Sequence, residues 1–156
     1  VAGTVRLVIA GDGSARQALR ESIDRRGLRD RVTLLGRVDD ETLIDLYANC
    51  LAVLFAPYQE DYGYVTLESF LARKPVITAR DSGGTLEFVA DGVNGCVCDP
   101  TPASLAAAVD RLAADPGLAA ELGDRGHASV RGISWDHVVE RLVAGARIAD
   151  TAGATA

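Results

Sequence analysis

Methionine is absent from this sequence, even at position 1, and cysteine, histidine, lysine and tryptophan are all scarce. The 3 cysteines are an odd number for a disulfide framework, which favours buried thiols in a reducing, cytoplasmic compartment. Cys96 and Cys98 lie two positions apart in an expected strand, but the histidines, His127 and His137, are far along the chain. We therefore expect no metal site. The missing initiating methionine is expected of an excised piece or a processed chain.

Basic side chains are fewer than acidic ones, with 16 Lys and Arg against 22 Asp and Glu and a net charge of −6. A nucleic-acid or anionic membrane surface needs clustered Lys and Arg, so neither is an expected partner. Long apolar runs are also absent, and none approaches the roughly 18–20 residues of a transmembrane helix. The 48% hydrophobic content is enough for a packed core, in one domain or in one half of a two-domain protein.

Short apolar runs alternate with helical patterns along the chain. The expected strands are 5–10, 31–35, 51–56, 74–78 and 96–98. The expected helices are 14–27, 41–49, 64–72, 101–114, 116–130 and 134–149, with a short one over 83–90. Apolar strands without alternation, each followed by a helix, are typical of a parallel sheet covered by helices on both faces. We therefore predict an α/β fold, with one domain over residues 1–149 and a frayed tail over 150–156.

Four loops leave the carboxyl ends of the expected strands, where ligands bind in open parallel sheets. These loops are residues 11–13, 36–38, 58–63 and 82–84. Because the strands are expected to be parallel, the four loops should line one edge of the sheet.

The most informative stretch places two carboxylates, Glu60 and Glu68, on either side of Gly63 at an expected helix start. The backbone N–H groups of Gly63, Tyr64 and Val65 would then face a diphosphate, because a helix N-terminus binds anions and glycine permits close approach. Glu68 would accept hydrogen bonds from a ribose, and Glu60 would hold a sugar hydroxyl or stabilise positive charge at an anomeric carbon. The alternatives are an ordinary turn glycine and two solvated carboxylates.

Other motifs are less specific. Residues 11–13 are a truncated version of a dinucleotide-binding glycine loop, and a tight strand-to-helix turn explains them better. The pair Gly83-Gly84 either approaches the same ligand or forms a structural turn. Trp135 most simply packs in the core, with Ser134 as a helix cap.

Motifs in one order and spacing cover nearly the whole chain. They are Leu7–Gly13, Arg31–Gly36, Glu60 with Glu68, Lys74–Ile77, Ser82–Gly84 with Glu87, Asp91–Gly95 and Ile133–Trp135. With these motifs the chain resembles the C-terminal, donor-binding half of a glycosyltransferase of family 4. That family is retaining and has two Rossmann-like domains, the GT-B architecture, so the resemblance implies one Rossmann-like domain here.

The resemblance also implies roles for individual residues. Glu60 matches a glutamate beside the donor sugar and diphosphate and is the candidate catalytic residue, whereas Glu68 matches the glutamate that holds the ribose. The backbone of residues 63–65 matches the segment that cradles the phosphates. The donor would be a UDP- or GDP-linked sugar, with no metal or other cofactor required.

Three further residues, Gly36, Arg37 and Val38, match the loop that flanks the nucleotide base. The sequence departs from the family pattern at Arg73, which replaces a glycine before Lys-Pro, and at Ser69, which replaces an alanine. Family members also carry an Arg and Lys pair, upstream of the first strand seen here, that neutralises the diphosphate. Nothing before Arg6 can supply that pair.

The resemblance therefore implies a chain that binds the donor of a glycan-forming enzyme but is inactive alone. The complete enzyme would transfer a hexosyl group to the hydroxyl of a glycan, lipid or small-molecule acceptor bound by an N-terminal domain. It would be cytoplasmic, or held at the inner membrane through that domain. The alternative is a non-catalytic nucleotide-binding or interaction module derived from a glycosyltransferase. A nicotinamide dehydrogenase ranks third, because the full glycine fingerprint is missing.

Overall fold

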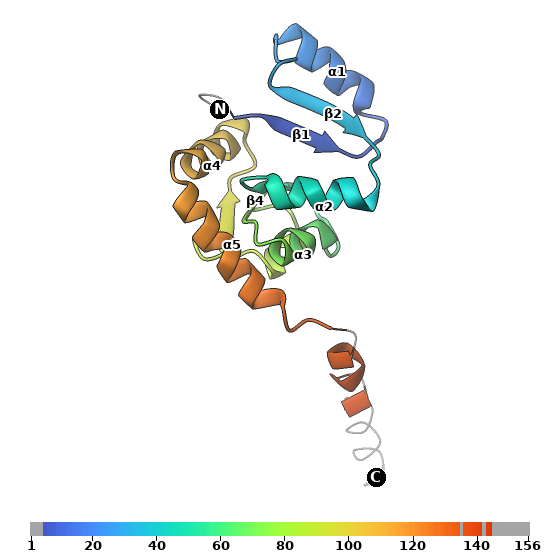
Figure 1. Ribbon diagram of the computed structural model, residues 1–156, viewed down its shortest axis with the longest axis vertical. Coiled ribbons are helices and arrows are strands. Elements are labelled where there is room, and N and C mark those ends of the chain that lie inside the picture. Colours follow the sequence, from blue (N-terminus) through green and yellow to red (C-terminus); the bar gives the residue numbers. More distant parts are fainter. Residues whose placement is uncertain (1–4, 135, 142, 145–156) are drawn as a thin grey trace.

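The computed structural model describes residues 5–134, 136–141 and 143–144 (Figure 1). Its elements in chain order are β1 (Leu7–Ala10), α1 (Arg16–Arg25), β2 (Val32–Gly36), α2 (Asp40–Asn49), β3 (Val53–Leu54), α3 (Tyr64–Leu71), β4 (Val76–Ala79), η1 (Gly84–Glu87), β5 (Gly95–Cys98), α4 (Pro102–Ala114) and α5 (Pro116–Val130). The predicted order of strands and helices is confirmed. Beyond α5, the described residues 136–141 and 143–144 are helical, whereas Trp135 and the predicted tail over 150–156 lie outside the described residues.

All strand pairs are parallel, as predicted, but they form two groups. One group is β1 with β2, and the other has the order β3-β4-β5. Figure 1 shows β1, β2 and α1 at one end of the molecule and the remaining elements at the other. The prediction of a buried strand over 51–56 is wrong in its extent, because β3 has only 2 residues and pairs on one side alone. Leu51 and Leu54 are accordingly 37% and 42% exposed.

The core surrounds β4, whose four residues are all buried. Neighbouring residues of a strand point to opposite faces, and the two hydrophobic clusters follow this rule. Ile77 packs with Leu112 of α4 and with Cys96, whereas Val76 packs with Phe70 of α3. Helices therefore cover both faces of the β3-β4-β5 sheet, which confirms the predicted fold class.

Glycines in α5 allow this helix to lie directly against α3. Gly123 and Gly126 are buried, and a methyl group on Gly126 would overlap the ring of Phe70. A methyl group on Gly123 would overlap the carbonyl of Arg73, just after α3. The close contact fixes the position of α3.

The end of α3 is a left-handed turn at Arg73, which has φ 58°. The Lys74 N–H donates to the Ser69 carbonyl at 2.8 Å and the Arg73 N–H to the Phe70 carbonyl at 3.0 Å. This is the Schellman arrangement, in which the left-handed residue is usually glycine. The arginine at this position therefore leaves the turn unchanged and adds an ion pair to Asp124 at 2.7 Å.

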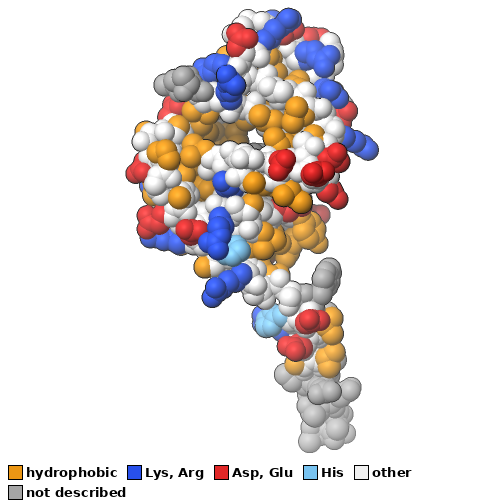
Figure 2. Space-filling model, in the orientation of Figure 1, with side chains coloured by type: hydrophobic (Ala, Val, Ile, Leu, Met, Phe, Trp, Pro, Cys, Tyr) orange, Lys and Arg blue, Asp and Glu red, His pale blue; other side chains and the backbone are white. Residues whose placement is uncertain are grey.

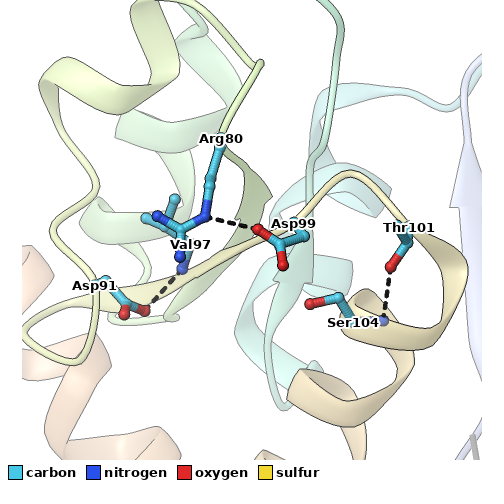
Figure 3. Close-up of polar contacts among 6 residues, drawn as sticks. All are labelled: Arg80, Asp91, Val97, Asp99, Thr101 and Ser104. Carbon is cyan, nitrogen blue, oxygen red and sulfur yellow. Dashed lines mark hydrogen bonds and ion pairs between the residues drawn. The ribbon is translucent and has the colours of Figure 1, made fainter.

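One ion pair joins the segments that follow β4 and β5, and two hydrogen bonds lie near it (Figure 3). Arg80, which follows β4, pairs with Asp99, which follows β5, at 2.9 Å. The Asp91 carboxylate accepts a hydrogen bond from the Val97 N–H at 2.9 Å, and Thr101 caps α4. Arg80 also directly precedes the loop over 81–84 at this edge of the sheet.

Candidate functional site

The loop before α3 is held by the loop after β4. The Gln59 N–H donates to the Asp81 carbonyl at 2.9 Å, and the Glu60 N–H donates to the Ser82 carbonyl at 3.2 Å. The Glu60 carbonyl in turn accepts a hydrogen bond from the Gly84 N–H at 2.7 Å. The parallel pairing of β3 with β4 thus resumes beyond the strands, and it fixes the main chain at Glu60.

The glycine pair after β4 makes this contact possible. A methyl group on Gly83 would lie 2.8 Å from the Glu60 nitrogen, and one on Gly84 would overlap the Asp61 carbonyl. Gly83 and Gly84 therefore form a structural turn, and the helix expected over 83–90 is the single 3₁₀ turn η1. The Glu60 carboxylate itself makes no hydrogen bond or ion pair with the residues that the structure describes.

Gly63 directly precedes α3, at the helix start as predicted. Two observations, its backbone conformation and its close neighbour, require a glycine there. Its φ of 75° is left-handed, and a methyl group there would lie 2.8 Å from the Thr85 hydroxyl oxygen. The first N–H groups of α3, at Tyr64 and Val65, have no partner within the helix. The buried Thr85 hydroxyl has no hydrogen-bond partner among the described residues. Unsatisfied donors and one buried hydroxyl thus surround the start of α3.

Glu68 is exposed on α3, and its carboxylate has one partner. The Tyr47 hydroxyl, on α2, donates a hydrogen bond of 2.8 Å to its Oε2 atom. Burial, and secondly the bond to Glu68, raise the pKa of Tyr47, so the phenol remains a donor at neutral pH. No sequence pattern indicates this contact, because the two residues are 21 positions apart.

Gly36, the last residue of β2, lies beside the loop after β1. Its carbonyl accepts a hydrogen bond from the Gly11 N–H at 2.7 Å, and the Arg16 guanidinium lies over its Cα. Arg16 also pairs with Asp12 at 2.8 Å, which closes the turn over residues 11–13. Residue 37 in the candidate base loop is exposed and residue 38 is half-buried.

The structure thus brings Glu60 and Gly63 together through the loop over 81–85 and gives Glu68 a partner on α2. It places Gly36 with Asp12 and Arg16 instead. Residues 2–128 match the family described as Glycosyl transferases group 1. The chain belongs to that family.

Known proteins match most of the chain in sequence or in structure. The alpha-1,3/1,6-mannosyltransferase ALG2 of Homo sapiens is 33% identical over 135 residues, which is 81% of this chain and 32% of the human protein. Sucrose-phosphate synthase from Thermosynechococcus elongatus has a structure that matches 96% of this chain with a TM-score of 0.80 and 29% identity, over 39% of its own length. HepE from Anabaena, in complex with UDP and glucose, matches 94% with a TM-score of 0.78 and 27% identity, over 41% of its length.

The chain therefore spans about a third of the human relative and about two fifths of the two solved proteins. Its fold is that of one part of the GT-B glycosyltransferases. Within the described part of the chain, no helix is long and apolar enough to cross a membrane.

Proposed function

We propose that the chain is the donor-binding part of a retaining, family 4 glycosyltransferase that transfers a hexosyl group from a nucleotide-diphosphate sugar to an acceptor hydroxyl. The observation that carries the proposal is the position of α3, which starts at Gly63 between Glu60 and Glu68, with Glu60 held by the loop after β4. Membership of the group 1 family supports it. Because the chain spans a fraction of its relatives, acceptor binding and transfer belong to the full-length protein.

The diphosphate would lie at the start of α3. There the N–H groups of Gly63, Tyr64 and Val65 are the available donors, and the helix dipole favours an anion by about 0.3–1 kcal/mol. The absence of a side chain at Gly63 lets a phosphate approach the backbone closely.

Glu68 would hold the ribose. Tyr47 occupies Oε2 of its carboxylate and leaves the other oxygen for hydroxyls of the ligand. A hydrogen bond to a charged group contributes about 1.5–3 kcal/mol. We expect the Tyr47 contact to keep the carboxylate in one orientation before the ligand arrives.

Glu60 would lie on the sugar side of the diphosphate. Its carboxylate is not engaged by the described residues, and its main chain is fixed on both sides. A fixed negative charge there would stabilise the positive charge that develops at the anomeric carbon as the bond to the diphosphate breaks. Gly36, Arg37 and Val38 would flank the base. We favour UDP over GDP as the nucleotide because the complex of HepE contains UDP.

Calorimetric titration with UDP, with GDP and with UDP-glucose tests the proposal on the folded chain. We expect UDP to bind, the Glu68→Ala variant to bind at least about tenfold more weakly, and the Glu41→Ala variant to bind unchanged. Glu41 is an exposed control on α2. No response of the folded protein to millimolar UDP or GDP would contradict the proposal. Binding without transfer by the full-length protein would identify a non-catalytic module instead.

A further inference from the structure

Thr85, in the segment after β4, lies against the start of α3. The residue is fully buried, with an exposed fraction of 0%, and its hydroxyl has no hydrogen-bond partner among the described residues. A methyl group built on Gly63 would lie 2.8 Å from the hydroxyl oxygen of Thr85 and 3.5 Å from its Cα. The hydroxyl therefore occupies the space beside the helix start that a side chain at position 63 would take.

An unpaired buried hydroxyl is not by itself a sign of a ligand. Within the described part of the chain, the hydroxyls of Thr66 and Thr78 are also unpaired and equally buried. Thr78 lies within β4, which pairs with a strand on each side and has 4 buried residues. Thr85 differs because it adjoins a helix start whose first N–H groups have no partner within the helix. A group that enters there and pairs with the hydroxyl is favoured, because an unpaired buried hydroxyl costs free energy.

The segment that leads into α3 offers further unpaired donors. The main-chain N–H groups of Asp61, Tyr62 and Gly63 make no hydrogen bond to the residues that the structure describes. Glu60, just before them, is fixed at both its N–H and its carbonyl. The run of unpaired N–H groups therefore extends from the loop into α3, and no N–H bond resists a small shift of residues 61–63.

The two segments that meet at this point carry no positive charge. Residues 54–72 and 81–99 contain no Lys or Arg, whereas Glu60, Asp61 and Glu68 are acidic. Figure 2 shows acidic side chains gathered over α2, the helix that contacts α3 through Tyr47. Within these two segments, an anion at the start of α3 therefore depends on uncharged donors, which are N–H groups and hydroxyls.

We propose that Thr85 is a further binding residue for the diphosphate, and that its hydroxyl donates a hydrogen bond to a phosphate oxygen at the start of α3. The inference rests on the proposed function, because it takes the diphosphate to lie at the N–H groups of residues 63–65. A small shift of residues 61–63 uncovers the hydroxyl, and the absence of a side chain at Gly63 lets the phosphate come close to it. The hydroxyl then gains the partner that the described residues do not supply.

Calorimetric titration of the 156-residue chain with UDP tests the proposal on three variants. Thr85→Val keeps the shape of the side chain but loses the hydroxyl, and it should bind UDP at least about fivefold more weakly. Thr85→Ser keeps the hydroxyl and should bind UDP as tightly as the wild-type chain. Thr78→Val is the matched control, because it removes an equally buried and unpaired hydroxyl within β4, and its binding should be unchanged.

Melting temperatures separate a contact with the ligand from a role in packing. Without UDP, Thr85→Val and Thr78→Val should both melt at the wild-type temperature or above it, because each removes an unpaired buried polar group. With UDP, the rise in melting temperature should be smaller for Thr85→Val than for Thr78→Val. Weaker binding by Thr85→Val together with a lower melting temperature would indicate packing and overturn the proposal.

Two further outcomes of the titration would also overturn the role of Thr85. One is unchanged UDP binding by Thr85→Val, which would leave the diphosphate site itself in place. The other is equal weakening by Thr85→Val and Thr85→Ser, because the serine variant retains the hydroxyl. If Thr85→Val does not fold, Thr85→Ala replaces it in the comparison with Thr85→Ser. A wild-type chain that binds neither UDP nor GDP would contradict the proposed function, and the role of Thr85 with it.

Discussion

Tyr47 and Glu68 are joined by a hydrogen bond of 2.8 Å between two helices, α2 and α3. The contact fixes the carboxylate that we assign to the ribose, and it is made by a residue that no motif singled out. If Tyr47 positions Glu68, Tyr47→Phe should weaken UDP binding several-fold, because the carboxylate loses its fixed orientation. Calorimetry measures this, with Ile44→Ala, at a 66% exposed position on α2, as the control. Tighter binding by Tyr47→Phe would show that the phenol competes with the ligand instead.

The titration of Tyr47 gives a prediction for alkaline pH. Burial and the bond to Glu68 raise its pKa above the usual value of about 10. A group with a raised folded-state pKa contributes stability that is present below its unfolded pKa and is lost as the pH rises through the folded value. The wild-type chain should therefore lose stability above about pH 10 more steeply than Tyr47→Phe. Urea unfolding at pH 8 to 11 measures the difference, and parallel curves would exclude this contribution.

The buried thiols should react slowly in the native state. Cys96 and Cys98 are buried in the core, and burial raises the pKa of both, so little thiolate is present at pH 8. Modification by a disulfide reagent should be far slower in buffer than in a denaturant. Rapid modification of both cysteines in the folded chain would mean that β5 opens readily to solvent.

The contact between α5 and α3 should not tolerate a side chain at Gly126. Gly126→Ala would place a methyl group within the ring of Phe70, and we expect a loss of about 1–3 kcal/mol in the free energy of unfolding. Gly132→Ala is the matched control, because nothing lies within 4 Å of its added methyl group. Denaturant unfolding of both variants measures the difference, and equal losses would mean that the two helices move apart at little cost.

Two variants of Arg73 separate the strain of its left-handed backbone from the effect of its ion pair. Arg73→Ala removes the ion pair to Asp124 but keeps a Cβ atom at φ 58°. Arg73→Gly removes the ion pair and the Cβ atom. We expect the glycine variant to be more stable than the alanine variant by about 1 kcal/mol, because a left-handed conformation strains only a residue with a Cβ. Equal or lower stability of the glycine variant would show that the turn carries no strain.

The sequence by itself determined the order of strands and helices, the parallel sheet and the start of α3 at Gly63. These follow from local causes: apolar runs, cap residues such as Asp39, which accepts from the Thr42 N–H at 2.8 Å, and glycines at left-handed positions. The family motifs also picked out Glu60 and Glu68 as candidate site residues, whose assigned roles stay predictions.

Only the tertiary structure decided which distant residues meet. No periodicity links Tyr47 to Glu68, and nothing local shows that Gly83 and Gly84 leave room for the main chain at Glu60. The sequence also suggested a full strand over 51–56, whereas only the 2 residues of β3 are a strand in the structure. The physical reason is that a strand's extent and burial depend on neighbours on both sides, and those neighbours come from remote parts of the chain.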